Sequence, residues 1–180
     1  MNIYIVRHGQ TDWNVEGRYG GRIDVPLNKK GLEQAYLTKE KLQDIIFDKI
    51  YSSPLIRAIT TAKIIRDQNI IIDKRIIERN NGDLEGKLKT EIKEKIDFND
   101  PNSTKYNIES ITEFRERIYD FLDEVSSDTI SNNVLIVTHA GVGIYARCYF
   151  EGDPFDGDYS KYKINNCESI KYSVRRKIRS

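Results

Sequence analysis

Short apolar runs alternate along the chain with longer segments in which apolar residues recur at helical spacing. Runs typical of strands lie at 3–6, 48–51, 70–77, 134–137 and 170–174. Two of them, 3–6 and 134–137, are apolar at every position, which is typical of strands covered on both faces. Strands that alternate with helices in this way predict an α/β fold, a three-layer sandwich in which helices flank a mostly parallel central sheet.

Helices are expected at 27–47, from Ser53 to about 65, at 109–125 and from the end of the fourth apolar run to about 150. We expect Asn28 to cap the first helix, Ser53 to cap the second, and Pro54 to take the first helical position of the second. The residues of the first helix expected to face the core are Leu32, Ala35, Leu42, Ile45 and Ile46.

The composition is that of a globular chain, with 38% hydrophobic and 32% charged residues among 180. This length predicts a single domain over 1–180. The net charge is +1, which excludes attachment to nucleic acid or membrane through bulk charge. We therefore expect neither partner, and either a monomer or a homodimer.

The chain has two cysteines and two histidines, too few and too far apart for a disulfide framework, a CxxC pair or a convincing zinc site. No apolar stretch approaches the ~20 residues of a membrane span. Arg7 and His8 interrupt the first apolar run, so the start of the chain does not resemble a secretion signal. These features favour a cytoplasmic protein with no metal.

Charged and imidazole side chains follow three of the expected strands. Arg7 and His8 end the first, Arg57 stands early in the helix after the second, and His139 follows the fourth. Ligands of open parallel sheets bind beyond the carboxyl ends of the strands, which is where these residues are placed. Two arginine forks, two imidazoles and helix N-termini suit a tetrahedral dianion such as phosphate.

Two kinds of site could use this set of residues. An imidazole that attacks phosphorus would form a phosphohistidine, whereas two imidazoles that only bind would make a phosphate-binding module. Phosphoryl transfer also needs an acid to protonate the leaving oxygen. Glu78 and Glu85 both lie in a glycine-containing loop after a strand, and their chemistry alone leaves the choice between them open.

The octapeptide RHGQTDWN at 7–14 resembles the signature of the histidine phosphatase superfamily, which includes cofactor-dependent phosphoglycerate mutases and their phosphatase relatives. Blocks at 21–35, 51–62, 78–86, 137–141 and 166–170 resemble the later motifs of that family, in the same order. The resemblance extends from position 3 to about 172 and implies the phosphoglycerate mutase-like fold.

The resemblance also implies roles for individual residues. His8 would be the nucleophile, and Glu78 would be the general acid and then the general base, leaving Glu85 a structural or rim residue. The phosphate clamp would consist of Arg7, Arg57 and a protonated His139. Further phosphate donors would come from Asn14, Ala140 and Gly141, with a rim at Gly20, Gly21 and Arg22. The family chemistry implies no metal and no organic cofactor.

Three functions are compatible with such a site: a phosphatase, a phosphoglycerate mutase and a non-catalytic phosphate-binding module. Asn80 and Asn81 replace the His-Tyr of the mutases, and the lid expected at 87–108 is short. A small lid excludes water poorly, which favours hydrolysis. We expect a metal-independent histidine phosphatase acting on a small metabolite, such as a sugar phosphate or α-ribazole 5'-phosphate, with the mutase as the alternative.

Two charged segments give opposite indications about the substrate. The expected lid contains Lys87, Lys89, Lys93, Lys95 and Lys105, which would attract a second anionic group. The acidic loop at 151–158 would repel a polyanion if it lined the entrance to the site. The sequence leaves this question open.

Overall fold

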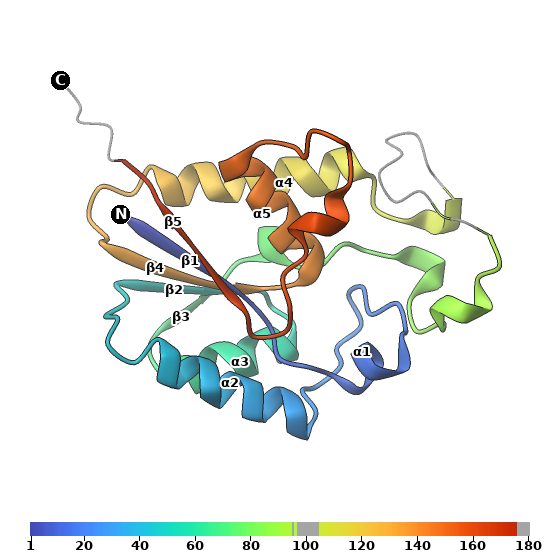
Figure 1. Ribbon diagram of the computed structural model, residues 1–180, viewed down its shortest axis with the longest axis horizontal. Coiled ribbons are helices and arrows are strands. Elements are labelled where there is room, and N and C mark those ends of the chain that lie inside the picture. The colour runs from blue at the N-terminus through green and yellow to red at the C-terminus, as the bar shows by residue number, and fades with distance from the viewer. Residues whose placement is uncertain (95, 97–104, 176–180) are drawn as a thin grey trace.

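A five-stranded sheet runs through the centre of the part of the chain that the computed structural model describes, residues 1–94, 96 and 105–175 (Figure 1). The strands are β1 (Asn2–Arg7), β2 (Lys49–Ser52), β3 (Ile70–Ile72), β4 (Asn133–Thr138) and β5 (Ser169–Ser173). They lie in the order β3-β2-β4-β1-β5. Only β5 is antiparallel to its neighbour, so the expected α/β fold with a mostly parallel sheet is confirmed.

Helices cover both faces of this sheet. The α-helices of the described residues are α1 (Asp12–Glu16), α2 (Lys29–Lys41), α3 (Ile56–Ile65), α4 (Ile111–Ser126) and α5 (Ala140–Glu151), of which the last four cover the sheet (Figure 1). Figure 1 shows α4 and α5 on one face and α2 and α3 on the other.

Successive residues of β1 pack into different layers. Ile3 and Ile5 belong to the core under α4 and α5, whereas Tyr4 and Val6 belong to the core over α2 and α3. A strand with two buried faces needs apolar side chains at every position. This packing explains the unbroken apolar run that the sequence shows at 3–6.

The first long helix begins where the sequence predicts and ends earlier. Asn28 caps α2, and its side chain accepts a hydrogen bond of 2.8 Å from the N–H of Gly31. The helix stops at Lys41 rather than near residue 47, so Ile46 is 80% exposed instead of facing the core. The guanidinium of Arg66 binds carbonyl oxygens in the segment after the helix, which gives this non-helical backbone its partners. Leu32, also expected in the core, is 38% exposed.

Two other expectations about element boundaries are wrong. Helix α3 has Leu55 as its N-cap, and Ser53 and Pro54 precede the helix. Strand β3 ends at Ile72 and is followed by a 3-10 turn, η1 (Lys74–Ile76), although the apolar run continues to Ile77. In both places polar groups bind distant parts of the chain: the Ser53 hydroxyl contacts His139, and the carbonyls of Arg75 and Ile77 accept hydrogen bonds from Arg117.

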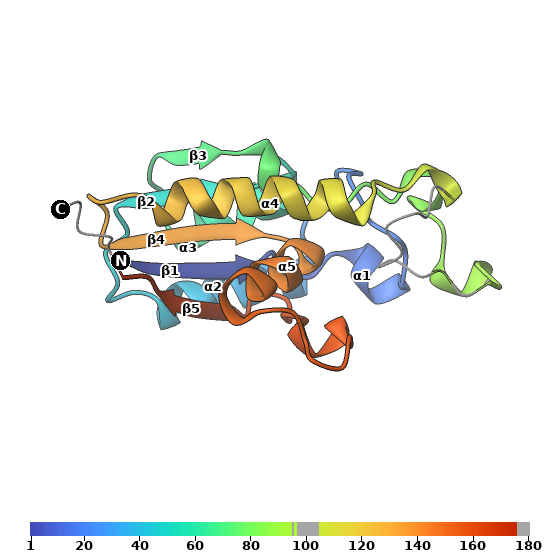
Figure 2. The same cartoon turned by 90° about the horizontal axis from the view of Figure 1, so that it is seen from above.

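The helix α4 is amphipathic and is capped by its own first residues. Ser110 accepts a hydrogen bond from the N–H of Glu113, and the Glu113 side chain reaches back to the N–H of Ser110. The buried face of α4 consists of Phe114, Ile118, Phe121, Leu122 and Val125. These residues fix the helix over the sheet, with its N-terminus near the carboxyl ends of the strands (Figure 2).

A close approach of two glycines brings the end of β1 against the start of α2. A Cβ atom on Gly9 would lie 2.4 Å from the carbonyl oxygen of Gly31, and one on Gly31 would lie 2.1 Å from that of Gln10. No side chain fits at either position. The loop that leaves β1 is therefore held tightly against the N-terminus of α2.

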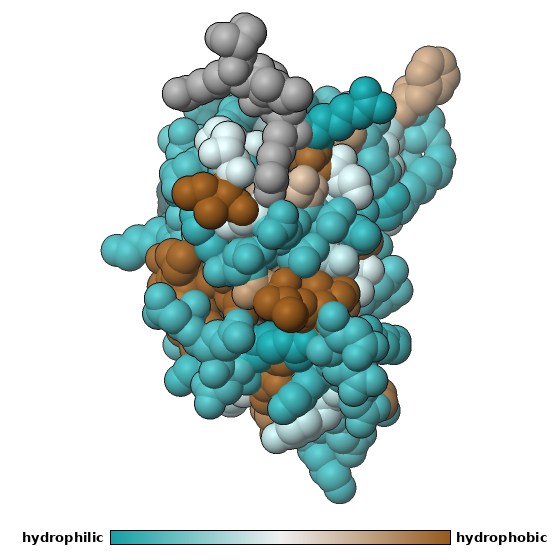
Figure 3. Space-filling model, turned by 90° about the vertical axis from the view of Figure 1, so that its left-hand side faces the viewer, coloured by the Kyte–Doolittle hydropathy of each residue, from teal (hydrophilic) through white to brown (hydrophobic). Residues whose placement is uncertain are grey.

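The connections after the carboxyl ends of the parallel strands gather at one end of the molecule, together with α1, η2 (Gly82–Leu84) and η4 (Lys105–Asn107) (Figure 2). The opposite end is mostly hydrophilic, with separate apolar patches (Figure 3). In the described residues, no helix has both the length and the apolar character that a membrane span requires.

Candidate active site

A cavity of about 370 Å³ opens beyond the carboxyl ends of β1 and β4. It brings together most of the residues that the sequence places in the site: Arg7, His8, Asn14, Gly20, Gly21, Arg57, Glu78, Ala140 and Gly141. His139 lies just behind this lining, with its ring centroid 5.1 Å from that of His8. Arg22 is the one residue of the expected rim that does not line the cavity.

His8 ends the turn after β1 with its ring buried and oriented. Its Nδ1 lies 2.7 Å from the carbonyl oxygen of Gly9, which can only accept, so Nδ1 carries the ring proton. Burial first, and then the charges of Arg57 and Arg7, hold the pKa of His8 well below its usual value, although the Gly9 carbonyl opposes this shift. The ring is therefore neutral, and its Nε2 lone pair is free to act as a nucleophile.

The guanidinium groups of Arg7 and Arg57 are fixed by backbone carbonyls on one side of the cavity. Arg7 donates to the carbonyl of Ile164 at 3.0 Å, and Arg57 donates to those of Ile23 and Gly21 at 2.8 Å each. Burial lowers the pKa of both arginines, but an ordinary guanidinium titrates so far above neutral pH that both stay charged. Two buried positive charges beside His8 provide the attraction for a phosphate group.

His139 differs from the expectation in its charge. Its ring is completely buried, and burial followed by the charge of Arg57 holds its pKa well below the usual value. In this structure His139 is therefore neutral rather than protonated. Its Nε2 lies 2.6 Å from the hydroxyl of Ser53, which the sequence suggested as a helix cap.

Glu78 reaches the cavity from the irregular segment after η1. Its carboxylate accepts hydrogen bonds from the N–H groups of Arg79 at 2.9 Å and Gly141 at 3.1 Å. A Cβ atom on Gly141 would lie 2.5 Å from a Glu78 oxygen, so only glycine leaves room for the carboxylate at the start of α5. The N–H of Gly141, expected to contact phosphate, is bound to Glu78 here.

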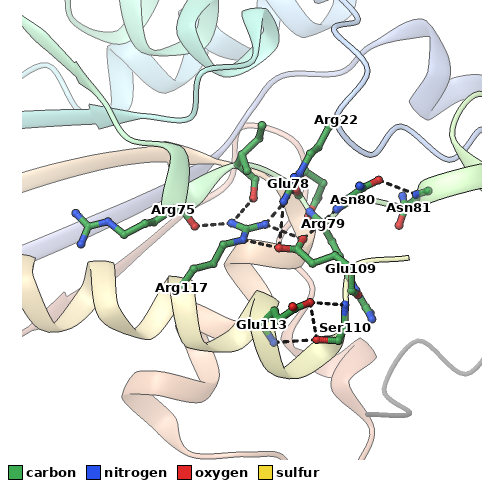
Figure 4. A network of polar contacts seen from close by, with 12 residues as sticks. Arg22, Arg75, Glu78, Arg79, Asn80, Asn81, Glu109, Ser110, Glu113 and Arg117 are labelled. Carbon is green, nitrogen blue, oxygen red and sulfur yellow. Dashed lines mark hydrogen bonds and ion pairs between the residues drawn. The ribbon is translucent and has the colours of Figure 1, made fainter. Parts of the chain in front are cut away.

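Glu85, the other carboxylate considered, points away from the cavity. Its Oε1 accepts hydrogen bonds from the backbone N–H groups of Arg22 at 2.9 Å and Asn81 at 3.0 Å. This oxygen also fills the space where a side chain on Gly21 would lie. Glu85 thus has a structural position between two loops, and the side chain of Arg22 extends instead toward Glu78 and Glu109 (Figure 4).

The remaining donor near the phosphate position is Asn14 of α1. Its Oδ1 accepts from the N–H of Thr11 at 3.1 Å and from the side chain of Asn166 at 3.3 Å. Asn166 also donates to the carbonyl of His8 at 2.9 Å, which ties α1 to the turn after β1. With its oxygen occupied in this way, Asn14 presents its amide nitrogen as the donor for an anion.

The lining of the cavity is strongly cationic, a property that the sequence showed only in part. Besides the two expected arginines, Arg18, Arg79 and Lys89 line it, against the single carboxylate of Glu78. Lys89 is exposed, with its ammonium over the ring of Tyr19, and partial desolvation followed by the charges of Lys163 and Arg7 lowers its pKa. The spacing of these residues along the chain gave no sign that they converge.

The expected lid is described at 87–94, 96 and 105–108. It contributes Lys89 to the cavity through the 3-10 turn η3 (Lys89–Glu91), and Leu88 forms an antiparallel bridge with Arg18. Residues 95 and 97–104 of the expected lid, including Lys95, lie outside the described residues. The acidic loop 151–158 does not line the cavity, and its Asp153 and Asp156 pair with Arg115 and Lys161.

Within residues 1–94, 96 and 105–175, no group of three or more His, Cys, Asp or Glu side chains is placed so that it could hold a metal ion. Both cysteines are buried, and burial raises the pKa of each thiol to about 12. The chemistry of the cavity is therefore that of imidazole, guanidinium and carboxylate groups. Fold and site together define a protein whose cavity is suited to hold a phosphate group.

Comparison with known proteins agrees with this definition. The model of the histidine phosphatase superfamily (branch 1) matches residues 3–177. Phosphoserine phosphatase 1 from Hydrogenobacter thermophilus is 33% identical over 184 residues, which cover 97% of this chain and 85% of that protein. Phosphoglycerate mutase-like protein 4 from Arabidopsis thaliana is 32% identical over 160 residues, 81% of this chain and 70% of that protein.

A solved structure shows the same arrangement. The alpha-ribazole phosphatase from Shigella flexneri superposes with a TM-score of 0.83 at 26% identity, covering 97% of this chain and 91% of that one. The chain belongs to the histidine phosphatase superfamily (branch 1). The relatives support a histidine-type phosphatase that acts on small molecules, in a family that also contains mutases.

Proposed function

We propose that this enzyme hydrolyses a small phosphomonoester through a phosphohistidine at His8. The observation that carries the proposal is the hydrogen bond from Nδ1 of His8 to the Gly9 carbonyl, which leaves Nε2 unprotonated in the cavity. An imidazole held in this tautomer between two buried arginines is an activated nucleophile. A site that only bound phosphate would have no need of a bare nitrogen beside a carboxylic acid.

In the first step, Nε2 of His8 forms a bond to phosphorus while the bond from phosphorus to the leaving oxygen breaks. Glu78 gives its proton to that oxygen, so the alcohol leaves neutral. In the second step, the Glu78 carboxylate takes a proton from water, and the resulting hydroxide attacks phosphorus and releases phosphate from His8. Arg7 and Arg57 offset the charge of the transferred group in both steps.

Hydrolysis is favoured over mutase activity by the relatives and by the small contribution that the described part of the lid makes to the cavity. Phosphatases are named among the relatives of high coverage, and the described lid contributes only one side chain, Lys89, to the cavity. Water that reaches the phosphohistidine competes with a second hydroxyl of the substrate. The mutase function is the alternative, because mutase-like proteins also occur among the relatives.

The substrate is proposed to carry a carboxylate beside its phosphate. Arg18, Arg79 and Lys89 line the cavity in addition to the two arginines that hold phosphate. Lys89 makes no ion pair with any described residue, so its ammonium is available to pair with a carboxylate of the substrate. A phosphatase acting on phosphoserine is among the relatives, and that substrate carries such a carboxylate.

The test is to incubate the enzyme with 3-phosphoglycerate and with phosphoserine and to follow the products by phosphorus NMR. Release of inorganic phosphate supports hydrolysis, whereas conversion of 3-phosphoglycerate to its 2-isomer without phosphate release supports the mutase. Phosphoethanolamine, which lacks the carboxylate of phosphoserine, is the control. Equal kcat/KM for these two compounds would contradict the carboxylate while leaving hydrolysis intact.

Lys89→Met tests the proposed carboxylate contact directly. The variant should lose about tenfold in kcat/KM for phosphoserine, since a hydrogen bond to a charged group contributes about 1.5–3 kcal/mol, and should keep its rate on phosphoethanolamine. Lys87→Met on the same segment is the matched control, because Lys87 does not line the cavity.

We also propose that residues 1–180 form one domain in which 87–108 is a small lid over the site. The near-neutral net charge supports a cytoplasmic enzyme with no nucleic-acid or membrane partner, acting as a monomer or homodimer. Size-exclusion chromatography with light scattering distinguishes these two oligomeric states.

A further inference from the structure

The segment that carries Glu78 has no regular secondary structure of its own. After β3 ends at Ile72, the chain forms η1 and then runs irregularly through 77–81 before η2. Carbonyl groups of such a segment have no helix or sheet partner and must find others if they are buried. The partners come from the N-terminal half of α4 and the residue two positions before it (Figure 4).

Arg117 of α4 binds three carbonyl groups in this segment. Its guanidinium donates to the carbonyls of Arg75, of Ile77 at 2.8 Å and of Glu78 at 3.2 Å. Three bonds from one rigid fork fix the direction of the backbone on both sides of Glu78. The stiff, planar group lies over the ring of Phe114, at 4.7 Å from the ring centroid.

Glu109 completes this arrangement by collecting four donors on its two carboxylate oxygens. Arg117 donates to both oxygens at 2.8 and 3.0 Å, Arg22 donates at 3.0 Å, and the N–H of Asn80 donates at 3.1 Å. Burial alone would raise the pKa of Glu109, but the hydrogen bonds and charge of Arg117 lower it overall. Glu109 therefore stays ionised and holds the fork of Arg117 in place.

Further bonds connect the same two segments next to Glu78. The N–H of Glu109 donates to the carbonyl of Asn80 at 2.9 Å, and Nε of Arg79 donates to the carbonyl of Glu109 at 2.8 Å. Arg22 from the rim donates a second hydrogen bond to the carbonyl of Glu78, at 3.3 Å. Every residue from 77 to 80 is thus tied to Glu109 or Arg117.

We propose that Glu109 and Arg117 are positioning residues that hold the carboxyl group of Glu78 at the leaving oxygen of the substrate. They line no part of the cavity and touch neither His8 nor the two arginines beside it, so they act through the segment 77–80, which carries Glu78 and Arg79. The proposal rests on the function proposed above. It extends the active site to a partly buried ion pair, between Arg117 of α4 and Glu109 just before that helix, which does not line the cavity.

A misplaced general acid lowers kcat/KM more for a substrate with a poor leaving group than for one with a good leaving group. A general loss of structure would lower both values alike. Phosphoserine has a poor leaving group and needs protonation of its leaving oxygen. The phenolate of 4-nitrophenyl phosphate leaves without much help. A shift of the acid by about 1 Å can cost about 10²-fold in rate. We expect Glu109→Gln and Arg117→Met to lower kcat/KM about 10- to 100-fold for phosphoserine and less than about threefold for the aryl substrate.

Inorganic phosphate serves as the probe of the phosphate clamp. Its inhibition constant should stay within about twofold of wild type in both variants, because Arg7, Arg57 and His139 are untouched. Arg115→Met is the matched control: Arg115 stands on the same helix and pairs with Asp153 at 2.9 Å, away from Glu78. It should leave the ratio of the two rates unchanged.

Two further variants keep the test decisive if the ion pair cannot be altered without unfolding. Arg117→Lys retains the charge and should recover part of the phosphoserine activity. Arg22→Met removes one bond to the Glu78 carbonyl from the exposed side and should shift the substrate ratio in the same direction. Circular dichroism confirms that each variant is folded before its rates are compared.

Equal losses for both substrates, or a ratio in Arg117→Met that matches Arg115→Met, would overturn the proposal. Failure of the proposed function looks different, because wild type would then form no phosphohistidine on either substrate. A rapid-quench measurement of labelled His8 in the wild-type enzyme separates the two outcomes.

Discussion

The hydroxyl of Ser53 lies 2.6 Å from Nε2 of His139. Ser53 Oγ also accepts a hydrogen bond from the N–H of Leu55 at 3.4 Å, and we expect it to donate its own proton to Nε2 of His139. A neutral ring that accepts at Nε2 must carry its hydrogen on Nδ1. That nitrogen has no hydrogen-bond partner among the described residues and can donate to an anion beside His8.

Ser53→Ala should therefore weaken phosphate binding although Ser53 never touches phosphate. Loss of one hydrogen bond costs about 0.5–1.5 kcal/mol, so we expect the inhibition constant of inorganic phosphate to rise about 3- to 10-fold. The matched control is Ser52→Ala, because the hydroxyl of Ser52 binds the carbonyl of Ser53 and not His139. Unchanged phosphate inhibition in Ser53→Ala would contradict the tautomer derived above.

Replacement of His8 should abolish turnover. His8→Ala removes the proposed nucleophile, and trapping with a labelled phosphoester should show phosphohistidine in wild type only. The ring is 4% exposed and satisfies the Gly9 carbonyl, so the variant should also lose about 1–3 kcal/mol of stability. A folded variant that still turned over at the wild-type rate would exclude His8 as the nucleophile.

Replacement of Glu78 should separate the two chemical steps. Glu78→Gln is expected to slow phosphoryl transfer from phosphoserine by about 10²–10⁴-fold. On an aryl phosphate the first step should suffer less, while the second still needs a base for water. Stopped-flow assays should therefore show a burst of phenolate followed by slow release of phosphate.

Glu85→Gln is the control for this experiment. Its carboxylate binds two backbone N–H groups outside the cavity, so the change should affect stability and not the order of the steps. A burst in Glu85→Gln together with wild-type kinetics in Glu78→Gln would reverse the assignment of the acid.

Acid should destabilise the folded protein through both histidines. The pKa values of His8 and His139 are lowered in the folded state, mainly by burial, so the unfolded chain binds more protons once the pH falls below about 6.5. This contribution to stability is complete above that pH and is lost as the pH falls. Between pH 7.5 and 5.5 we expect a loss of about 2–3 kcal/mol in urea unfolding, and roughly half of it in His8→Asn.

The sequence predicted those parts of the fold that depend on local patterns. A run of apolar residues buried on both faces, such as 3–6, has one structural interpretation, and Asn28 caps a helix with its own neighbours. Ser53 resembled the same kind of cap, but its hydroxyl binds a histidine 86 positions away. Likewise, nothing within 70–77 shows that Arg117 holds the backbone away from the strand conformation.

In the candidate site, too, the residues that stand in local motifs were predictable and those that depend on distant contacts were not. Arg7, His8, Arg57 and Glu78 stand in motifs that resemble those of a known family, and the structure brings them to one cavity. Lys89 was visible only as one of several lysines. Its convergence with Arg18 depends on the bridge between Arg18 and Leu88, a contact between segments 70 residues apart that no local pattern encodes.

The carbonyl groups that hold Arg7 and Arg57 determine when the flexibility of these side chains is lost. A free arginine gives up about 2 kcal/mol of rotamer entropy when it is immobilised. Here the carbonyl groups of Ile164, Ile23 and Gly21 hold both guanidinium groups through hydrogen bonds within the protein. That entropy is lost when the chain folds, so the binding of an oxyanion should carry a small entropic penalty from these two residues, and vanadate or phosphate should meet a cavity that is already shaped for it.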